Sequence, residues 1–82
     1  MSITKESLIN LISEALDSDE AITDESSMEN IPDWDSLGHL SILTSLDAAT
    51  EGKASAISDL GDTESVKEII SILQNENLID ES

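Results

Sequence analysis

The chain has 82 residues, of which 19 are Asp or Glu and three are Lys, with no Arg, so its formal net charge is -16. This charge repels nucleic acids and anionic membranes, and the absence of cysteine excludes disulfides and thiolate metal sites. The N-terminus lacks the basic segment and the continuous apolar run of a signal peptide, and no apolar run approaches the roughly 20 residues that span a bilayer. We therefore expect one small cytoplasmic domain over residues 1–82, without membrane insertion.

The hydrophobic residues favour packed helices over a sheet. They make up 38% of the chain, and nearly all are aliphatic, with Trp34 as the only aromatic residue and Val66 as the only valine. Sheets draw more heavily on valine and aromatic residues. The composition therefore predicts an all-α domain.

The first predicted helix covers residues 5–16, with Thr4 as its N-cap and Glu6 near the positive end of its dipole. Its apolar residues recur at helical spacing on one face. They are Leu8, Leu11, Ile12, Ala15 and Leu16.

A polar segment with eight acids follows at residues 17–35. It is longer than most connections between helices, which predicts either a packed functional loop or disorder. Four apolar residues can attach it to the core, which favours packing, and Pro32 prevents an early helix start. These apolar residues are Ile22, Met28, Ile31 and Trp34.

The second predicted helix begins at Asp35-Ser36 and ends near Thr50, with Asp35 as N-cap and Gly52 as the residue after the C-cap. Its apolar residues form two adjacent stripes, more than one buried face requires. One stripe holds Ile42, Leu46 and Ala49, and the other holds Leu37, Leu40 and Thr44.

The remaining pattern predicts one short packed turn and a last helix. Ile57 and Leu60 are spaced for a single turn within residues 54–60, which Gly61 and Asp62 end. The last helix should begin after Thr63 as N-cap and end between residues 74 and 77. Its apolar positions are Val66, Ile69, Ile70, Ile72 and Leu73, and Leu78 and Ile79 then fold back before a polar tail.

Two kinds of chemistry are disfavoured by spacing. Asp17-Ser18-Asp19 begins like a calcium loop, but Ala21, Ile22 and Met28 stand where that loop needs an oxygen ligand, a glycine and a glutamate. No metal site is therefore expected.

Catalysis by a Ser-His pair is also disfavoured. His39 lies three residues after Ser36, so the two can share a helix face, but nothing supplies an orienting group or an oxyanion hole. We expect His39 to face the surface or a partner, and we expect no catalytic residues.

The Ser36 hydroxyl, at a helix N-terminus where a phosphate can be held, remains to be explained. The segment Asp35-Ser36-Leu37, with the long first loop, the short turn before the last helix and the strong acidity, resembles the acyl carrier proteins from Thr4 to about Leu78. This resemblance implies a four-helix carrier bundle of three main helices and a short third one. It implies a monomer whose Ser36 bears 4′-phosphopantetheine, transferred from coenzyme A by a phosphopantetheinyl transferase.

The resemblance also implies roles for residues near Ser36. Asp35, Leu37 and Gly38 would surround the attached cofactor, with Gly38 leaving space for the arm. A second group would contact the transferase and the enzymes that load, transfer or condense acyl and aminoacyl groups: Leu37, Leu40, Thr44 and Asp47. Ile42 and Leu46 would face the core, where carriers can shelter an acyl chain.

One departure from the family pattern points to a specialised carrier. The second predicted helix has only Asp47 and Glu51 as acids near its end, and the surface beside Ser36 is nearly neutral. This is more typical of carriers dedicated to a secondary metabolite, a glycan or a lipid than of housekeeping fatty acid synthesis. The alternative is a non-enzymatic acidic helical module that binds a basic protein, although the acids spread over loops and ends.

Overall fold

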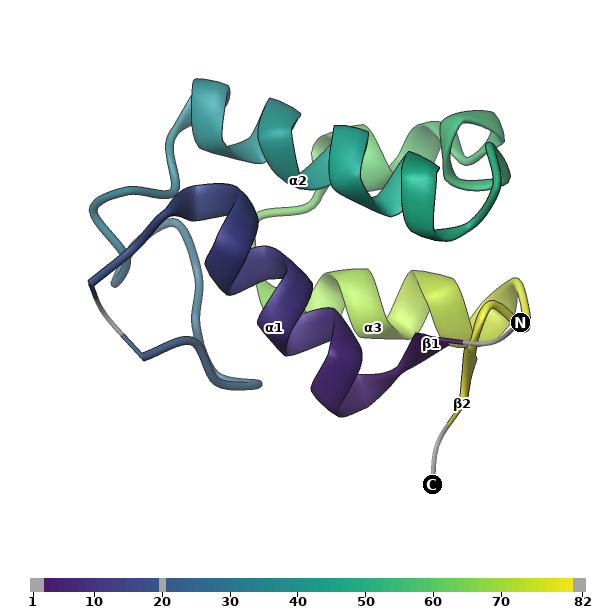
Figure 1. The fold of residues 1–82 in the computed structure, drawn as a ribbon, viewed down its shortest axis with the longest axis horizontal. Helices are drawn as coiled ribbons and strands as arrows, with labels where there is room; N and C mark the ends of the chain where they lie inside the picture. Colours follow the sequence, from purple (N-terminus) through teal and green to yellow (C-terminus); the bar gives the residue numbers. More distant parts are fainter. Residues whose placement is uncertain (1–2, 20, 81–82) are drawn as a thin grey trace.

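The computed structural model describes residues 3–19 and 21–80, which form three α-helices, two 3-10 turns and one pair of very short strands. The helices are α1 (Lys5–Leu16), α2 (Ser36–Ala49) and α3 (Val66–Asn75) (Figure 1). The 3-10 turns η1 (Ala54–Ala56) and η2 (Ser58–Asp62) connect α2 to α3. Among the described residues, no helix has the length and apolarity needed to cross a membrane.

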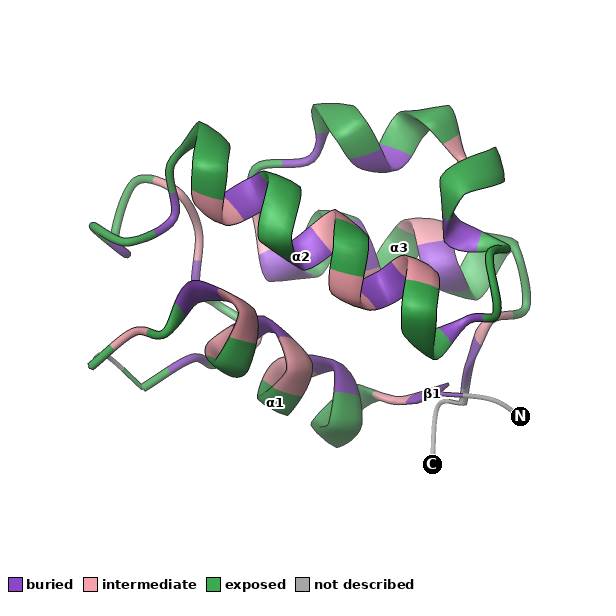
Figure 2. Cartoon of the chain, turned by 45° about the horizontal axis from the view of Figure 1, so that its top comes forward, coloured by how far each residue is buried: buried purple, intermediate pink, exposed green. Residues whose placement is uncertain are grey.

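Helix α1 forms as its sequence pattern predicts. The Thr4 hydroxyl accepts a hydrogen bond from the Ser7 backbone N–H at 3.0 Å, which confirms Thr4 as the N-cap. Turns of α1 and α2 alternate between buried and exposed segments, as amphipathic helices do (Figure 2). The buried residues of α1 are Leu8, Ile12 and Leu16, while Leu11 and Ala15 are half-buried.

The long loop between α1 and α2 is packed against the rest of the domain. Ile22, Ile31 and Trp34 are buried and Met28 is half-buried, which confirms the predicted packing. The loop also pairs with the start of α3. The Met28 N–H donates to the Glu64 carbonyl at 2.9 Å, and the Val66 N–H donates to a loop carbonyl at 3.0 Å.

The C-terminus of α2 differs by one residue from the prediction. Glu51 follows the C-cap Thr50 with a positive φ of 57°, and Gly52 comes next with a φ of 88°. The Gly52 N–H donates to the Asp47 carbonyl at 2.8 Å, which is the six-residue bond of a Schellman motif. Glu51 is therefore the residue after the C-cap, and Gly52 takes the position after that.

The segment between α2 and α3 forms two 3-10 turns where one was predicted. Ile57 separates them and is half-buried, whereas Leu60 is buried and points into the core. The second turn continues through Gly61 and Asp62, the residues expected to end it. The segment is thus wound more tightly than a short α-helix.

Helix α3 begins two residues later than predicted. Ser65 is its N-cap and accepts from the Glu68 N–H at 3.2 Å, while the Glu68 carboxylate accepts from the Glu64 N–H at 3.0 Å. Thr63 is instead buried, and its hydroxyl donates to the Leu60 carbonyl at 2.8 Å. Thr63 is the C-cap residue of η2 and lies two residues before the observed N-cap of α3, so its hydroxyl belongs to the turn and not to the start of the helix.

The two ends of the described chain meet beside α3. Strand β1 (Ile3–Thr4) pairs in parallel with β2 (Ile79–Asp80), with Ile3 opposite Ile79. Both isoleucines are buried, so the predicted fold-back of residues 78–79 is confirmed, while the strand pair was not predicted. The polar tail beyond Asp80 lies outside the described residues.

The core lies between the three helices and under the loop. Its fully enclosed members come from every major element, which gives one continuous hydrophobic cluster. They are Leu8, Ile12, Trp34, Ile42, Leu46, Leu60, Val66, Ile69 and Leu73.

Candidate functional site

Ser36 is the first residue of α2, and its position is fixed by the cap before it. The Asp35 backbone is extended, and its carboxylate accepts from the Gly38 N–H at 2.9 Å, which confirms Asp35 as the N-cap. The Asp35 carbonyl accepts the first helical bond, from the His39 N–H at 2.8 Å. The cap therefore sets Ser36 as the first residue of the helix, where the serine is exposed.

Hydrogen-bonding groups are free at this end of the helix. Ser36 is exposed, and its hydroxyl has no hydrogen-bond partner among residues 3–19 and 21–80. In the same described ranges, the backbone N–H groups of Ser36 and Leu37 have no acceptor. A free hydroxyl thus stands beside two free donors at the positive end of the α2 dipole.

Large apolar side chains are exposed next to Ser36. Leu37 is 76% exposed and Leu40 is 59% exposed, and Thr44 is exposed one turn further along α2. This excludes core packing for the two leucines. Thr44 donates its hydroxyl hydrogen to the Leu40 carbonyl at 3.0 Å, so its methyl group adds to the apolar surface.

The other stripe of α2 faces the core, except at its end. Ile42 and Leu46 have no exposed surface, as predicted. Ala49 was predicted to share their face, but it is exposed. The helix ends there, and the buried Thr50 takes the place under the last turn, with its hydroxyl donating to the Leu46 carbonyl at 2.7 Å.

His39 is buried, contrary to the expectation that it faces the surface or a partner. Only 6% of the residue is exposed, and both ring nitrogens have partners. Nδ1 accepts from Trp34 Nε1 at 3.1 Å, and Nε2 donates to the Leu60 carbonyl at 3.0 Å. The ring is therefore not a base for Ser36, to which it makes no hydrogen bond.

Gly38 has a structural role that replaces the predicted one. A Cβ atom at this position would lie 2.5 Å from the Asp33 carbonyl oxygen and 2.7 Å from Leu16 Cδ2. The space beside Gly38 is thus filled by the loop backbone and by α1. It is not open space through which an attached arm could leave.

The charges around Ser36 correct a further expectation. Asp33 and Asp35 are both exposed directly before the serine, so the surface there is acidic, and only the helix beyond it is nearly neutral. No group of three or more His, Asp or Glu residues in the described ranges is arranged to hold a metal ion. The single ion pair among the described residues lies elsewhere: Lys5 Nζ is 2.9 Å from Asp24, and it lowers the pKa of that carboxyl by hydrogen bonding and by charge.

Comparison with known proteins gives no relative from which a role could be transferred. No family model matches the chain, and no curated protein and no solved structure matches it either. A function must therefore be inferred from the residues of this chain and from the geometry around Ser36.

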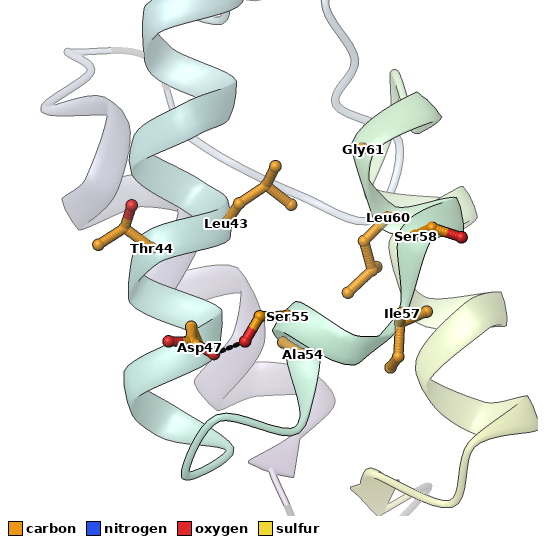
Figure 3. A pocket seen from close by; sticks show the side chains of 9 residues that line it. All are labelled: Leu43, Thr44, Asp47, Ala54, Ser55, Ile57, Ser58, Leu60 and Gly61. Carbon is orange, nitrogen blue, oxygen red and sulfur yellow. Dashed lines mark hydrogen bonds between the residues drawn. The ribbon is translucent and has the colours of Figure 1, made fainter.

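A hollow of about 380 Å³ lies between α2 and the two 3-10 turns (Figure 3). Leu43, Ile57 and Leu60 supply its apolar wall. Asp47, predicted to contact partners, is at its edge and accepts a hydrogen bond from the Ser55 hydroxyl. The full lining is Leu43, Thr44, Asp47, Ala54, Ser55, Ile57, Ser58, Leu60 and Gly61.

The sequence contained only part of the signal for this hollow. Ile57 is predicted to pack within the short turn, but the periodicity assigns neither Ile57 nor Leu43 to a cavity wall. The hollow is lined by residues of α2 and of both 3-10 turns, so it depends on how these elements pack together.

Proposed function

We propose that the chain is a carrier protein whose Ser36 bears 4′-phosphopantetheine and presents thioester-bound acyl or aminoacyl groups to partner enzymes. The observation that carries this proposal is the exposed Ser36 hydroxyl at the first residue of α2, which has no hydrogen-bond partner in the described part of the chain and lies beside the exposed Leu37 and Leu40. The carrier has no catalytic residues of its own and works in the cytoplasm as a monomer.

The chemistry of attachment fits the helix N-terminus. The Ser36 oxygen attacks phosphorus in coenzyme A, a new P–O bond forms, adenosine 3′,5′-bisphosphate leaves, and a base of the transferase takes the hydroxyl proton. The free N–H groups of Ser36 and Leu37 would then lie next to the phosphodiester. Asp35 remains close, but its carboxylate is already occupied by the Gly38 N–H.

The attached thiol supplies what the chain lacks. The protein has no cysteine, so it cannot form a thioester with its own side chains. The arm provides the thiol, and partner enzymes provide the bases and nucleophiles that load and unload it. Because partner enzymes supply the bases in this proposal, Ser36 needs no base next to it.

The fold is compatible with a variant of the four-helix carrier bundle. In this proposal η1 and η2 stand in place of the short third helix, and the hollow between them and α2 shelters part of the cargo. Its volume is at the lower end of the range for small-molecule sites. Ile42 and Leu46 are buried in the core on the same helix and do not line the hollow.

A specialised pathway fits the surface of α2 better than housekeeping fatty acid synthesis. Asp47 is the only acid within the helix, and the Ser55 hydroxyl already engages it. Partner recognition would then rest on Leu37, Leu40 and Thr44 more than on charge.

The test is co-expression with a broad-specificity phosphopantetheinyl transferase, followed by measurement of the intact mass. The wild type should gain one phosphopantetheine, and Ser36→Ala should gain none. Ser41→Ala is the matched control, because Ser41 is also an exposed serine of α2 and its loss should leave the gain unchanged. An unmodified wild type would contradict the proposal and favour the acidic interaction module.

A further inference from the structure

His39 connects three parts of the chain that meet behind Ser36. Its backbone belongs to the second turn of α2, its Nδ1 binds Trp34 in the loop, and its Nε2 binds the Leu60 carbonyl of η2. Thr63, in the linker to α3, donates to the same carbonyl at 2.8 Å, and its hydroxyl oxygen lies 3.4 Å from His39 Nε2. These contacts are buried, and Trp34 and His39 are 2% and 6% exposed.

The partners fix one protonation state of the ring. The indole Nε1 of Trp34 is only a donor, so Nδ1 of His39 must be unprotonated to accept from it. The Leu60 carbonyl is only an acceptor, so Nε2 must carry the proton. The neutral ring with hydrogen on Nε2 satisfies both partners, and the two rings lie nearly parallel, with 17° between their planes.

We propose that His39 is a positioning residue that holds the α2 N-terminus bearing Ser36 against the loop and η2, and that protonation of its ring breaks this connection. A proton on Nδ1 would face the Trp34 N–H, so two donors would meet in a buried site. The Trp34 bond is then lost, and with it one of the contacts that hold the loop before Asp35 and Ser36 against the helix.

Among the described residues, the elements packed around the ring place no charged side chain in contact with it to offset a positive charge. The loop before α2 contributes Asp33 and Asp35, η2 contributes Asp59 and Asp62, and Glu64 follows Thr63. All five are exposed, and none forms a hydrogen bond or ion pair with the ring. Within α2 the only other titratable residue is Asp47, which is engaged by Ser55.

The primary experiment uses the ¹⁵N-labelled wild type, so it does not depend on a variant that folds. At about pH 8, where the titration starts, the ring shifts should show hydrogen on Nε2, and the pH is then lowered until the ring is protonated. As the pH falls, the Trp34 indole N–H and the Ser36 amide should shift with the midpoint of the His39 ring. The amide of Ser71, on the exposed face of α3, should not follow that midpoint.

Two results of this titration would overturn the proposal. One is a ring with hydrogen on Nδ1. The other is a Ser36 amide that moves with the protonation of the neighbouring carboxylates and not with that of the ring.

Two variants separate the bonds of the ring. In His39→Asn the side-chain oxygen can accept from Trp34 in place of Nδ1, and in His39→Gln the amide nitrogen can donate to Leu60 in place of Nε2. Neither side chain titrates, so both should lose the shared midpoint at Ser36. A midpoint that persists in a folded variant would show that another group controls the Ser36 environment.

The consequence for modification rests on the proposed function. The rate of phosphopantetheine transfer onto wild-type Ser36 is divided by the rate onto Ser36 of the His39→Gln variant at the same pH. Taking this ratio cancels the pH dependence of the transferase itself. The ratio should fall as the pH is lowered. A constant ratio would refute the positioning role. Absence of any transfer would refute the carrier function alone, because the titration of Trp34 and Ser36 is read without the transferase.

Discussion

The carbonyl oxygen of Asp33 lies where Gly38 would carry a side chain, 2.5 Å from the position of a Cβ atom. Leu16, at the end of α1, approaches the same point from another direction, at 2.7 Å. The missing side chain thus allows the first turn of α2 to pack directly on the loop and on α1. Gly38 is required for packing within the domain.

Gly38→Ala should therefore destabilise the protein, although alanine is the better helix former. The added methyl group would overlap a backbone oxygen, which is less able to move than a flexible side chain, and we expect a loss of about 1–3 kcal/mol in the free energy of unfolding. Urea denaturation followed by circular dichroism measures it.

The matched control is Gly61→Ala in η2. No atom lies within 4 Å of a Cβ at Gly61, so its stability should change by no more than about 0.5–1 kcal/mol and in the stabilising direction. Equal losses in the two variants would contradict the packing role of Gly38.

Local signals were sufficient to predict much of this fold. Helix α1, the Asp35 cap and the buried face of α3 depend on apolar spacing and on caps, which are properties of short segments. The sequence also contains the signal for the observed cap of α3, because Ser65 and Glu68 have the spacing of a capping box, whereas Val66 stands three residues after Thr63.

The rest of the site depends on contacts between distant segments. Nothing in the neighbourhood of His39 indicates that Leu60, 21 residues away, accepts its hydrogen bond. From the sequence, Gly38 indicates only open space next to Ser36. The structure shows that the Asp33 carbonyl oxygen occupies the place of its missing side chain. The burial of His39 and the requirement for glycine at position 38 are therefore visible only in the tertiary structure.

Truncating a leucine should cost much more stability in the buried stripe of α2 than in the exposed stripe. Leu46→Ala should lose about 2–5 kcal/mol in the free energy of unfolding, because it leaves a cavity in the core. Leu40→Ala removes the same atoms from a side chain that is 59% exposed, so its loss should stay within about 0.5 kcal/mol. Thermal and urea unfolding measure both, and a large loss for Leu40→Ala would mean that this leucine is packed in the folded domain.

Leu37→Glu should impair modification of Ser36 while leaving the helical content intact. Leu37 is 76% exposed, so a charge there costs the fold little but removes an apolar contact next to the reacting hydroxyl. Ala48→Glu places the same charge at an exposed position near the other end of α2 and should be modified at the wild-type rate. The initial rate of phosphopantetheine transfer, with circular dichroism on both variants, decides between a partner contact and a general charge effect.

Asp35→Ala should destabilise the start of α2. The substitution removes the acceptor of the Gly38 N–H and should cost about 0.5–2 kcal/mol, the usual range for loss of an N-cap. Asp33→Ala is the matched control, since it removes another exposed carboxylate, two residues earlier, that makes no capping bond among the described residues. If both variants lose the same stability in urea denaturation, the effect comes from charge and not from the cap.

Salt should raise the melting temperature of the wild type. Nineteen acids and three lysines share a molecule whose largest dimension is 29 Å, and the one ion pair of the described residues is between exposed partners. At about 0.01 M ionic strength the screening length is roughly 30 Å, so carboxylates repel one another across the whole domain, and at about 0.1 M it falls to roughly 10 Å. Unfolding increases the mean distance between these charges, so screening should favour the folded state.

A series of NaCl concentrations read by circular dichroism tests this prediction, and a flat melting temperature would contradict it. MgCl₂ at matched ionic strength separates screening from cation association. Equal melting temperatures in the two salts indicate screening alone. A higher value in Mg²⁺ would show that the divalent ion associates with the acidic surface, even though no described group of side chains forms a dedicated metal site.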